Sequence, residues 1–103
     1  MATQVDESGA LESWLVRAHG RVQGVGYRDA CVQHARLLGV TGWVRNRLDD
    51  SVEAMLQGAP AQLERMCEWM REGMVAALVT ELEVTRVAPP FARFDGFERL
   101  PTR

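Results

Sequence analysis

One glycine-rich segment of the sequence is well suited to binding a phosphate group. Its sequence is Gly-Arg-Val-Gln-Gly-Val-Gly-Tyr-Arg at positions 20–28. Glycines let successive backbone N–H groups turn toward one centre, and a helix that begins directly after the loop adds partial positive charge there. Arg28 would lie at the start of that helix, where its guanidinium can bind the same anion through two hydrogen bonds. The alternative interpretation is a tight glycine turn beside a solvent-facing arginine.

The segment does not match the common nucleotide-binding motifs. A Walker loop ends in Gly-Lys-Ser/Thr, whereas this sequence contains no lysine. The dinucleotide fingerprint fails because Asp29 occupies the position of its third glycine. ATP and NAD are therefore disfavoured, and we expect an anion that is bound by arginine and backbone amides without a cofactor.

The neighbouring segments must form the elements that position this loop. Five of them have the alternation or composition of strands: 14–19, 41–46, 52–58, 82–85 and 97–100. Apolar residues on one face predict a helix over 27–38, which Gly39 ends. A second helix is expected to begin at Pro60, with an apolar stripe that continues to Met74.

This order predicts an α+β fold of the ferredoxin-like split βαβ (βαββαβ) type, with two helices on one face of a mixed, mostly antiparallel sheet. The usual strand order of that fold is 4-1-3-2, which makes the first and second strands parallel. Their C-terminal ends then share one edge of the sheet, about 10 Å apart. We expect a flexible leader over residues 1–12 and a single domain over residues 13–103.

Asn46 is the second candidate for chemistry, because it ends the second expected strand at that shared edge. An asparagine in such a place is most often only a turn former. Beside a phosphate loop, however, its amide can accept a hydrogen from water and donate to a phosphoryl oxygen.

Two linked motifs resemble those of the acylphosphatase family. The first is the segment 20–28, and the second is Gly42-Trp43-Val44-Arg45-Asn46 followed by Asp49 and Val52-Glu53. The resemblance covers about residues 14–100 and implies hydrolysis of the carboxyl–phosphate anhydride bond of acyl phosphates. It assigns the catalytic roles to Arg28 and Asn46. The residues expected to bind the substrate phosphate are Arg21, Val22, Gln23, Gly24, Val25, Gly26 and Tyr27.

The sequence departs from the family pattern at Asp50, where the family usually has glycine. Aspartate tolerates a left-handed backbone better than most residues, so we expect the turn to survive.

The expected mechanism is in-line attack of water on phosphorus. A carboxylate leaving group is a weak base that departs with little protonation, so charge stabilisation and water positioning suffice. Neither a metal nor a covalent nucleophile is required. His19, one residue before the loop, is the less favoured alternative as a covalent acceptor of phosphate.

Composition limits the class of partner. The chain carries 14 acidic and 12 basic residues, so no overall positive field gathers nucleic acid. Trp14 and Trp43 do not supply the aromatic pattern of an RNA-binding sheet. The longest apolar run, Met74 to Val79, falls far short of the roughly 20 residues that span a bilayer. Cys31 and Cys67 are too few for a metal cluster and are expected in the core.

We therefore expect a cytoplasmic monomer that acts on a small-molecule acyl phosphate. The first ten residues contain acids where a signal peptide needs bases. The alternative function is a non-catalytic ferredoxin-like module that binds an anion or a protein partner.

Overall fold

The computed structural model describes residues 10–103. The leader expected over residues 1–12 therefore lies mostly outside the described residues, and the first strand begins at Glu12. In chain order the elements are β1 (Glu12–Arg21), α2 (Tyr27–Leu38), β2 (Thr41–Asn46), β3 (Val52–Gly58), α3 (Pro60–Glu72), β4 (Leu78–Val87) and β5 (Phe97–Arg99). This order confirms the predicted βαββαβ fold.

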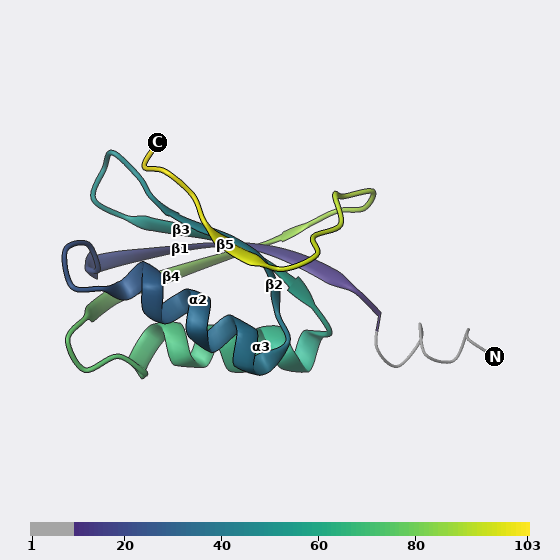
Figure 1. The fold of residues 1–103 in the computed structure, drawn as a ribbon, viewed down its shortest axis with the longest axis horizontal. Helices are drawn as coiled ribbons and strands as arrows, with labels where there is room; N and C mark the ends of the chain where they lie inside the picture. The colour runs from purple at the N-terminus through teal and green to yellow at the C-terminus, as the bar shows by residue number, and fades with distance from the viewer. Residues whose placement is uncertain (1–9) are drawn as a thin grey trace.

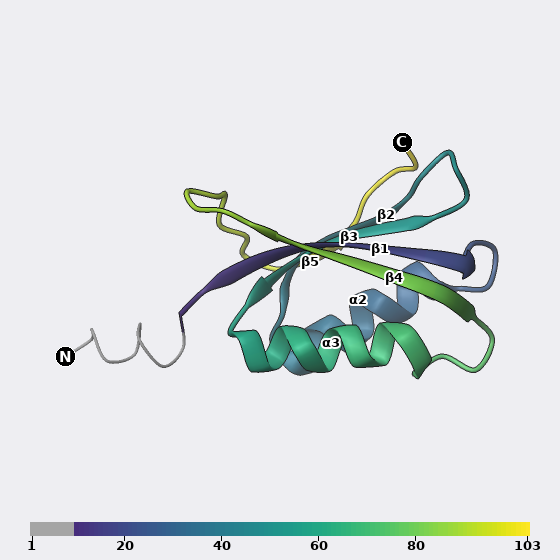
Figure 2. The same cartoon turned by 180° about the vertical axis from the view of Figure 1, so that it is seen from behind.

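The strands form one five-stranded sheet in the order β4-β1-β3-β2-β5. β1 and β2 are each antiparallel to β3, which lies between them, and are therefore parallel to one another. β5 adds to the outer edge of β2 in parallel register. Both helices pack on the same face of the sheet (Figures 1 and 2). The C-terminal ends of β1 and β2 thus lie at one edge, as the sequence predicted.

The core lies between the helices and the sheet. Alternate residues of β1, namely Trp14, Val16 and Ala18, are buried on the helix side. Cys31 and Cys67 are buried and unpaired, which confirms that they are core residues. None of the helices in residues 10–103 is long and apolar enough to cross a membrane.

The apolar stripe of α3 ends earlier than predicted. The helix stops at Glu72, and Met74, which was expected on it, lies in the connection to β4 and packs partly against the core. The Gly73 N–H donates to the Trp69 carbonyl at 2.7 Å and closes the last turn. Glycine propagates a helix poorly, so the chain leaves the helix at this point.

The turn between β2 and β3 adopts the conformation expected for it. Asp50 has a left-handed backbone with φ of 74°. Asp49 Oδ1 accepts hydrogen bonds from the Ser51 hydroxyl at 2.6 Å and from the Ser51 N–H at 3.0 Å. These bonds lower the pKa of Asp49 below its ordinary value.

The open face, defined as the face of the sheet away from the helices, carries a buried carboxylate. The side chain of Glu53 is 6% exposed and lies 3.1 Å from Arg17, 2.8 Å from Arg45 and 3.6 Å from Arg47. Burial alone would raise the pKa of Glu53, but the hydrogen bonds from Arg45 and Arg17 outweigh it and lower that pKa. We call these four residues the Glu53 cluster.

Candidate active site

The loop that leaves β1 turns directly into the N-terminus of α2. Gly24 and Gly26 have φ of 77° and 81°, a region that L side chains rarely adopt. Gly26 is the N-cap of the helix, and its carbonyl accepts the first helical hydrogen bond, from Ala30 at 3.1 Å. The glycine spacing in the sequence therefore reflects a real backbone requirement.

The N–H groups of this segment lack acceptors. Within residues 10–103, none of the N–H groups from Gln23 to Asp29 donates to a backbone carbonyl, and no side chain caps the helix. Unpaired N–H groups at a helix N-terminus, together with the helix dipole, attract an anion. The loop thus has the donors that a phosphate site needs.

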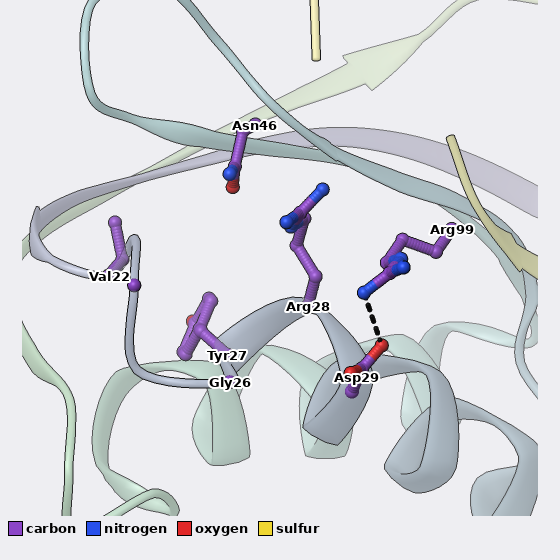
Figure 3. Close-up of a pocket in the computed structure, with 8 residues that line it drawn as sticks. Val22, Gly26, Tyr27, Arg28, Asp29, Asn46 and Arg99 are labelled. Atoms are coloured by element: carbon purple, nitrogen blue, oxygen red, sulfur yellow. Dashed lines mark hydrogen bonds and ion pairs between the residues drawn. The ribbon is translucent and has the colours of Figure 1, made fainter. Parts of the chain in front are cut away.

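These residues line a small pocket of about 80 Å³ (Figure 3). Its walls come from the loop, the first turn of α2, the end of β2 and β5. The lining residues are Val22, Gly24, Gly26, Tyr27, Arg28, Asp29, Asn46 and Arg99. The structure therefore brings Arg28 and Asn46 to one pocket from different elements, together with four of the seven residues expected to bind phosphate.

Asn46 ends β2 and reaches the pocket from the sheet. It lies opposite Val52 of β3, two residues after the buried Val44 and on the same face of the strand, so its side chain points to the helix side of the sheet. Its Oδ1 is buried and accepts no hydrogen bond from any residue of 10–103, and no other described side chain has a buried N or O atom in that condition. Such an orphaned acceptor in a pocket is the expected place for a water or a ligand group.

Arg28 reaches the pocket from the other side. It is the second residue of α2 and is half-buried. Its guanidinium makes no hydrogen bond or ion pair with any other residue in the described part of the chain. Figure 3 shows its guanidinium and the Asn46 amide pointing toward the same space. Two polar groups without partners therefore face one another across the pocket.

The remaining loop residues serve other contacts with their side chains. Gln23 Nε2 donates to the carbonyls of Arg47 at 2.9 Å and Ser51 at 2.8 Å, which joins the loop to the β2–β3 turn. Val25 packs against the core. Neither residue lines the pocket, and neither does Arg21.

Tyr27 lines the pocket, but its side chain belongs to the core. Its hydroxyl is buried and donates to the Met70 carbonyl at 2.7 Å. Burial raises the pKa of Tyr27 above its ordinary value. The hydroxyl therefore stays protonated, and Tyr27 can serve an anion only through its backbone.

Sequence reasoning missed two residues of the pocket. Arg99 Nη1 lies 2.9 Å from Asp29 Oδ1, and both residues line the pocket. The signal for Arg99 was the expected edge strand 97–100, in which Phe97 and Arg99 share a face. Because Phe97 is buried against the helices, Arg99 also points to the helix side.

His19 is not placed to accept phosphate. It alternates with the buried Ala18, so its side chain lies on the open face, where its Nε2 is 2.7 Å from Glu83 Oε1. It does not line the pocket.

Comparison with protein families gives a match that covers most of the chain. The acylphosphatase family model matches residues 14–99. An acylphosphatase of Ralstonia nicotianae is 67% identical over 96 residues, which are 93% of this chain and 94% of the relative. An acylphosphatase of Polaromonas naphthalenivorans is 58% identical over 98 residues, covering 95% of this chain and 97% of the relative.

A solved structure has the same architecture. The crystal structure of the acylphosphatase from Bacillus subtilis superimposes with a TM-score of 0.81 at 29% sequence identity. The match covers 86% of this chain and 98% of the other. The similarity thus extends from the two motifs to the whole arrangement of strands and helices.

Proposed function

We propose that Arg28 and Asn46 catalyse in-line attack of water on the phosphorus of an acyl phosphate. The premise is that the chain belongs to the acylphosphatase family and is an acylphosphatase, an enzyme that acts on an acyl phosphate. The observation that carries this proposal is the buried, unpartnered Oδ1 of Asn46 in the pocket of Arg28. A group without a partner in the free protein is available to a water and a substrate.

The phosphoryl group is bound by the loop and by Arg28. The unpaired N–H groups between Gln23 and Asp29 and the guanidinium of Arg28 donate to its non-bridging oxygens. These donors are already in place before the substrate arrives, so they stabilise the charge of the transition state without reorganisation. Binding also aligns the phosphorus with the attacking water.

Asn46 positions that water. Its Oδ1 accepts one hydrogen of the water, while its Nδ2 donates to a phosphoryl oxygen. The water oxygen forms a bond to phosphorus as the bond from phosphorus to the acyl oxygen breaks. The products are a carboxylate and a phosphate that carries the water's two protons. A carboxylate needs little protonation to leave, so the mechanism requires no general acid and no cofactor.

The proposed site binds the phosphate end of the substrate closely and leaves the acyl end largely unbound. The pocket volume of about 80 Å³ is sufficient for a phosphoryl group, and the acyl group would extend toward solvent. We therefore expect hydrolysis of acyl phosphates with varied acyl groups.

We also propose that the chain acts as a cytoplasmic monomer. Two buried, unpaired cysteines suit a reducing compartment, and the pocket described above combines the phosphate loop, Arg28 and Asn46 within a single chain. Light scattering after gel filtration should give a mass near 11.5 kDa. A stable dimer would contradict the monomer.

The proposed mechanism is tested by the hydrolysis of benzoyl phosphate in EDTA. The wild-type chain should turn over the substrate, and Arg28→Ala and Asn46→Ala should each lower kcat by about 10²-fold or more. Arg65→Ala removes an exposed arginine from α3 and is the matched control. Wild-type turnover that is retained in both pocket variants would contradict the assigned roles.

A further inference from the structure

The ion pair between Asp29 and Arg99 lies at the rim of the pocket, where a carboxylate is unexpected. Asp29 belongs to the first turn of α2, and both side chains line the pocket. The Arg99 side chain is 49% exposed and that of Asp29 is 66% exposed. An ion pair as exposed as this one adds little to folding stability. Its position therefore calls for an explanation other than stability.

Asp29 is a potential competitor for the phosphate site. With Gly26 as N-cap, it is the third residue of the helix. An acidic side chain at this position can reach back to the N–H of the N-cap residue, and the helix dipole favours it there. The Gly26 N–H has no acceptor among the described residues. A carboxylate that folded back onto this loop would occupy donors that the substrate phosphate needs.

Arg99 holds that carboxylate elsewhere. β5 runs parallel to β2 with Arg99 beside Val44, two residues before Asn46 on the same face. From there the guanidinium donates to Asp29 Oδ1 at 2.9 Å. Figure 3 shows the Asp29 side chain turned toward Arg99 and away from Gly26.

We propose that Arg99 is a positioning residue, which keeps the Asp29 carboxylate away from the loop N–H groups and so keeps the phosphate site open. The inference rests on the proposed function, since it assumes that the loop binds the phosphoryl group. Arg99 need not touch the substrate, because its effect passes through Asp29.

Arg36 provides a control for the possibility that Arg99 only holds α2 against β5. Arg36 lies near the other end of α2 and donates from Nη2 to the Phe97 carbonyl at 3.0 Å. It therefore also joins α2 to β5, but it does not line the pocket. Arg36→Gln removes the same charge and a similar contact while leaving Asp29 and Arg99 in place.

The experiment measures competitive inhibition by inorganic phosphate in four proteins: wild type, Arg99→Gln, Asp29→Asn and the double variant. Arg99→Gln should raise the Ki of phosphate and the KM of benzoyl phosphate about five- to tenfold, the scale of one charge-assisted hydrogen bond. Its kcat should fall less than twofold, because bound substrate has already displaced the carboxylate. Asp29→Asn should restore phosphate binding in the Arg99→Gln background and change it much less in the wild-type background.

Two outcomes would overturn the inference, each in a distinct way. An Arg99→Gln defect that Asp29→Asn does not rescue means that Arg99 contacts the substrate directly. An equal rise in Ki for Arg36→Gln means that Arg99 only fastens the helix. If Arg99→Gln fails to fold, Arg99→Met takes its place in the same cycle. Failure of wild type to bind phosphate and to hydrolyse benzoyl phosphate would instead sink the proposed function.

Discussion

The Glu53 cluster on the open face and the pocket on the helix side hold their central polar groups in opposite conditions. On the open face, the Glu53 cluster places three arginines around one buried carboxylate, with distances between 2.8 and 3.6 Å. On the helix side, Arg28 has no ion pair with any described residue, and Asn46 keeps a buried oxygen without a partner. The Glu53 cluster thus compensates its charges within the chain, whereas the pocket leaves Arg28 and the Asn46 oxygen unpaired beside the Asp29–Arg99 ion pair at its rim.

This difference separates structural from functional polar groups. A buried carboxylate is stable only if its charge is compensated, and the Glu53 cluster meets that requirement within the chain. The pocket leaves Arg28, the loop N–H groups and Asn46 Oδ1 unsatisfied by the described residues, which lowers the stability of the free protein but makes these groups available to a ligand. The comparison predicts that substitutions on the two faces affect different properties.

The largest expected effect is on catalysis, from Arg28→Gln. It should lower kcat/KM for benzoyl phosphate by about 10²- to 10³-fold, because a preorganised charge at the phosphoryl group is lost. Its melting temperature should stay near that of the wild type, since Arg28 has no partner to lose in the described chain. Arg45→Gln is the matched variant on the open face and should show the reverse pattern, with reduced stability and nearly full activity. Equal losses of activity in the two variants would remove the distinction between the faces.

The next largest effect is that of Asn46→Ala, which should lower activity without lowering stability. The substitution removes the means of positioning water and should lower kcat about 10²-fold. It also removes a buried acceptor that has no partner among the described residues, so the free energy of unfolding should be unchanged or higher by about 1 kcal/mol. Steady-state kinetics and urea denaturation measure the two quantities. A loss of more than about 1 kcal/mol of stability would show that the Asn46 amide is structural.

Glu53→Gln should lower stability and spare activity. It leaves three arginines without their carboxylate, and breaking a buried ion pair of this kind costs about 2 kcal/mol when the partners are partly exposed. Urea denaturation at pH 7 checks this value, with benzoyl phosphate hydrolysis as the measure of the intact site. A variant as stable as wild type would mean that the Glu53 cluster contributes nothing to folding.

The lowered pKa of Glu53 also predicts how folding stability depends on pH. Because its pKa is lower in the folded protein, the Glu53 carboxylate stabilises the fold above its ordinary pKa of 4.5. That stabilisation is lost as the pH falls from there through the lower, folded value. Wild type should therefore lose stability over this acidic range more steeply than Glu53→Gln. Parallel stability curves for the two proteins between pH 5 and pH 2 would contradict the assignment.

Much of this arrangement could be predicted from sequence because the deciding signals are local. The glycines at 24 and 26 require positive φ, and parallel strands bring the loop and Asn46 to one edge. The left-handed Asp50 was expected from the family's usual glycine at this position and from the tolerance of aspartate for that backbone conformation. The contact between Asp29 and Arg99 spans 70 positions and depends on the register of a three-residue edge strand, which no local pattern specifies. The missing partners of Arg28 and Asn46 were likewise visible only in three dimensions.

The smallest expected effect is that of substitutions at Gln23, in the loop between β1 and α2. Its amide donates to the Arg47 and Ser51 carbonyls and so joins the phosphate loop to the turn that follows Asn46. Gln23→Ala should raise the KM for benzoyl phosphate a few-fold, about 1 kcal/mol, because the loop and Asn46 then hold their relative position less firmly. Gln23→Glu cannot donate to the two carbonyls and adds a negative charge beside the loop, so its KM should rise further. If both variants bind substrate as wild type does, the loop is positioned by its glycines and by α2 alone.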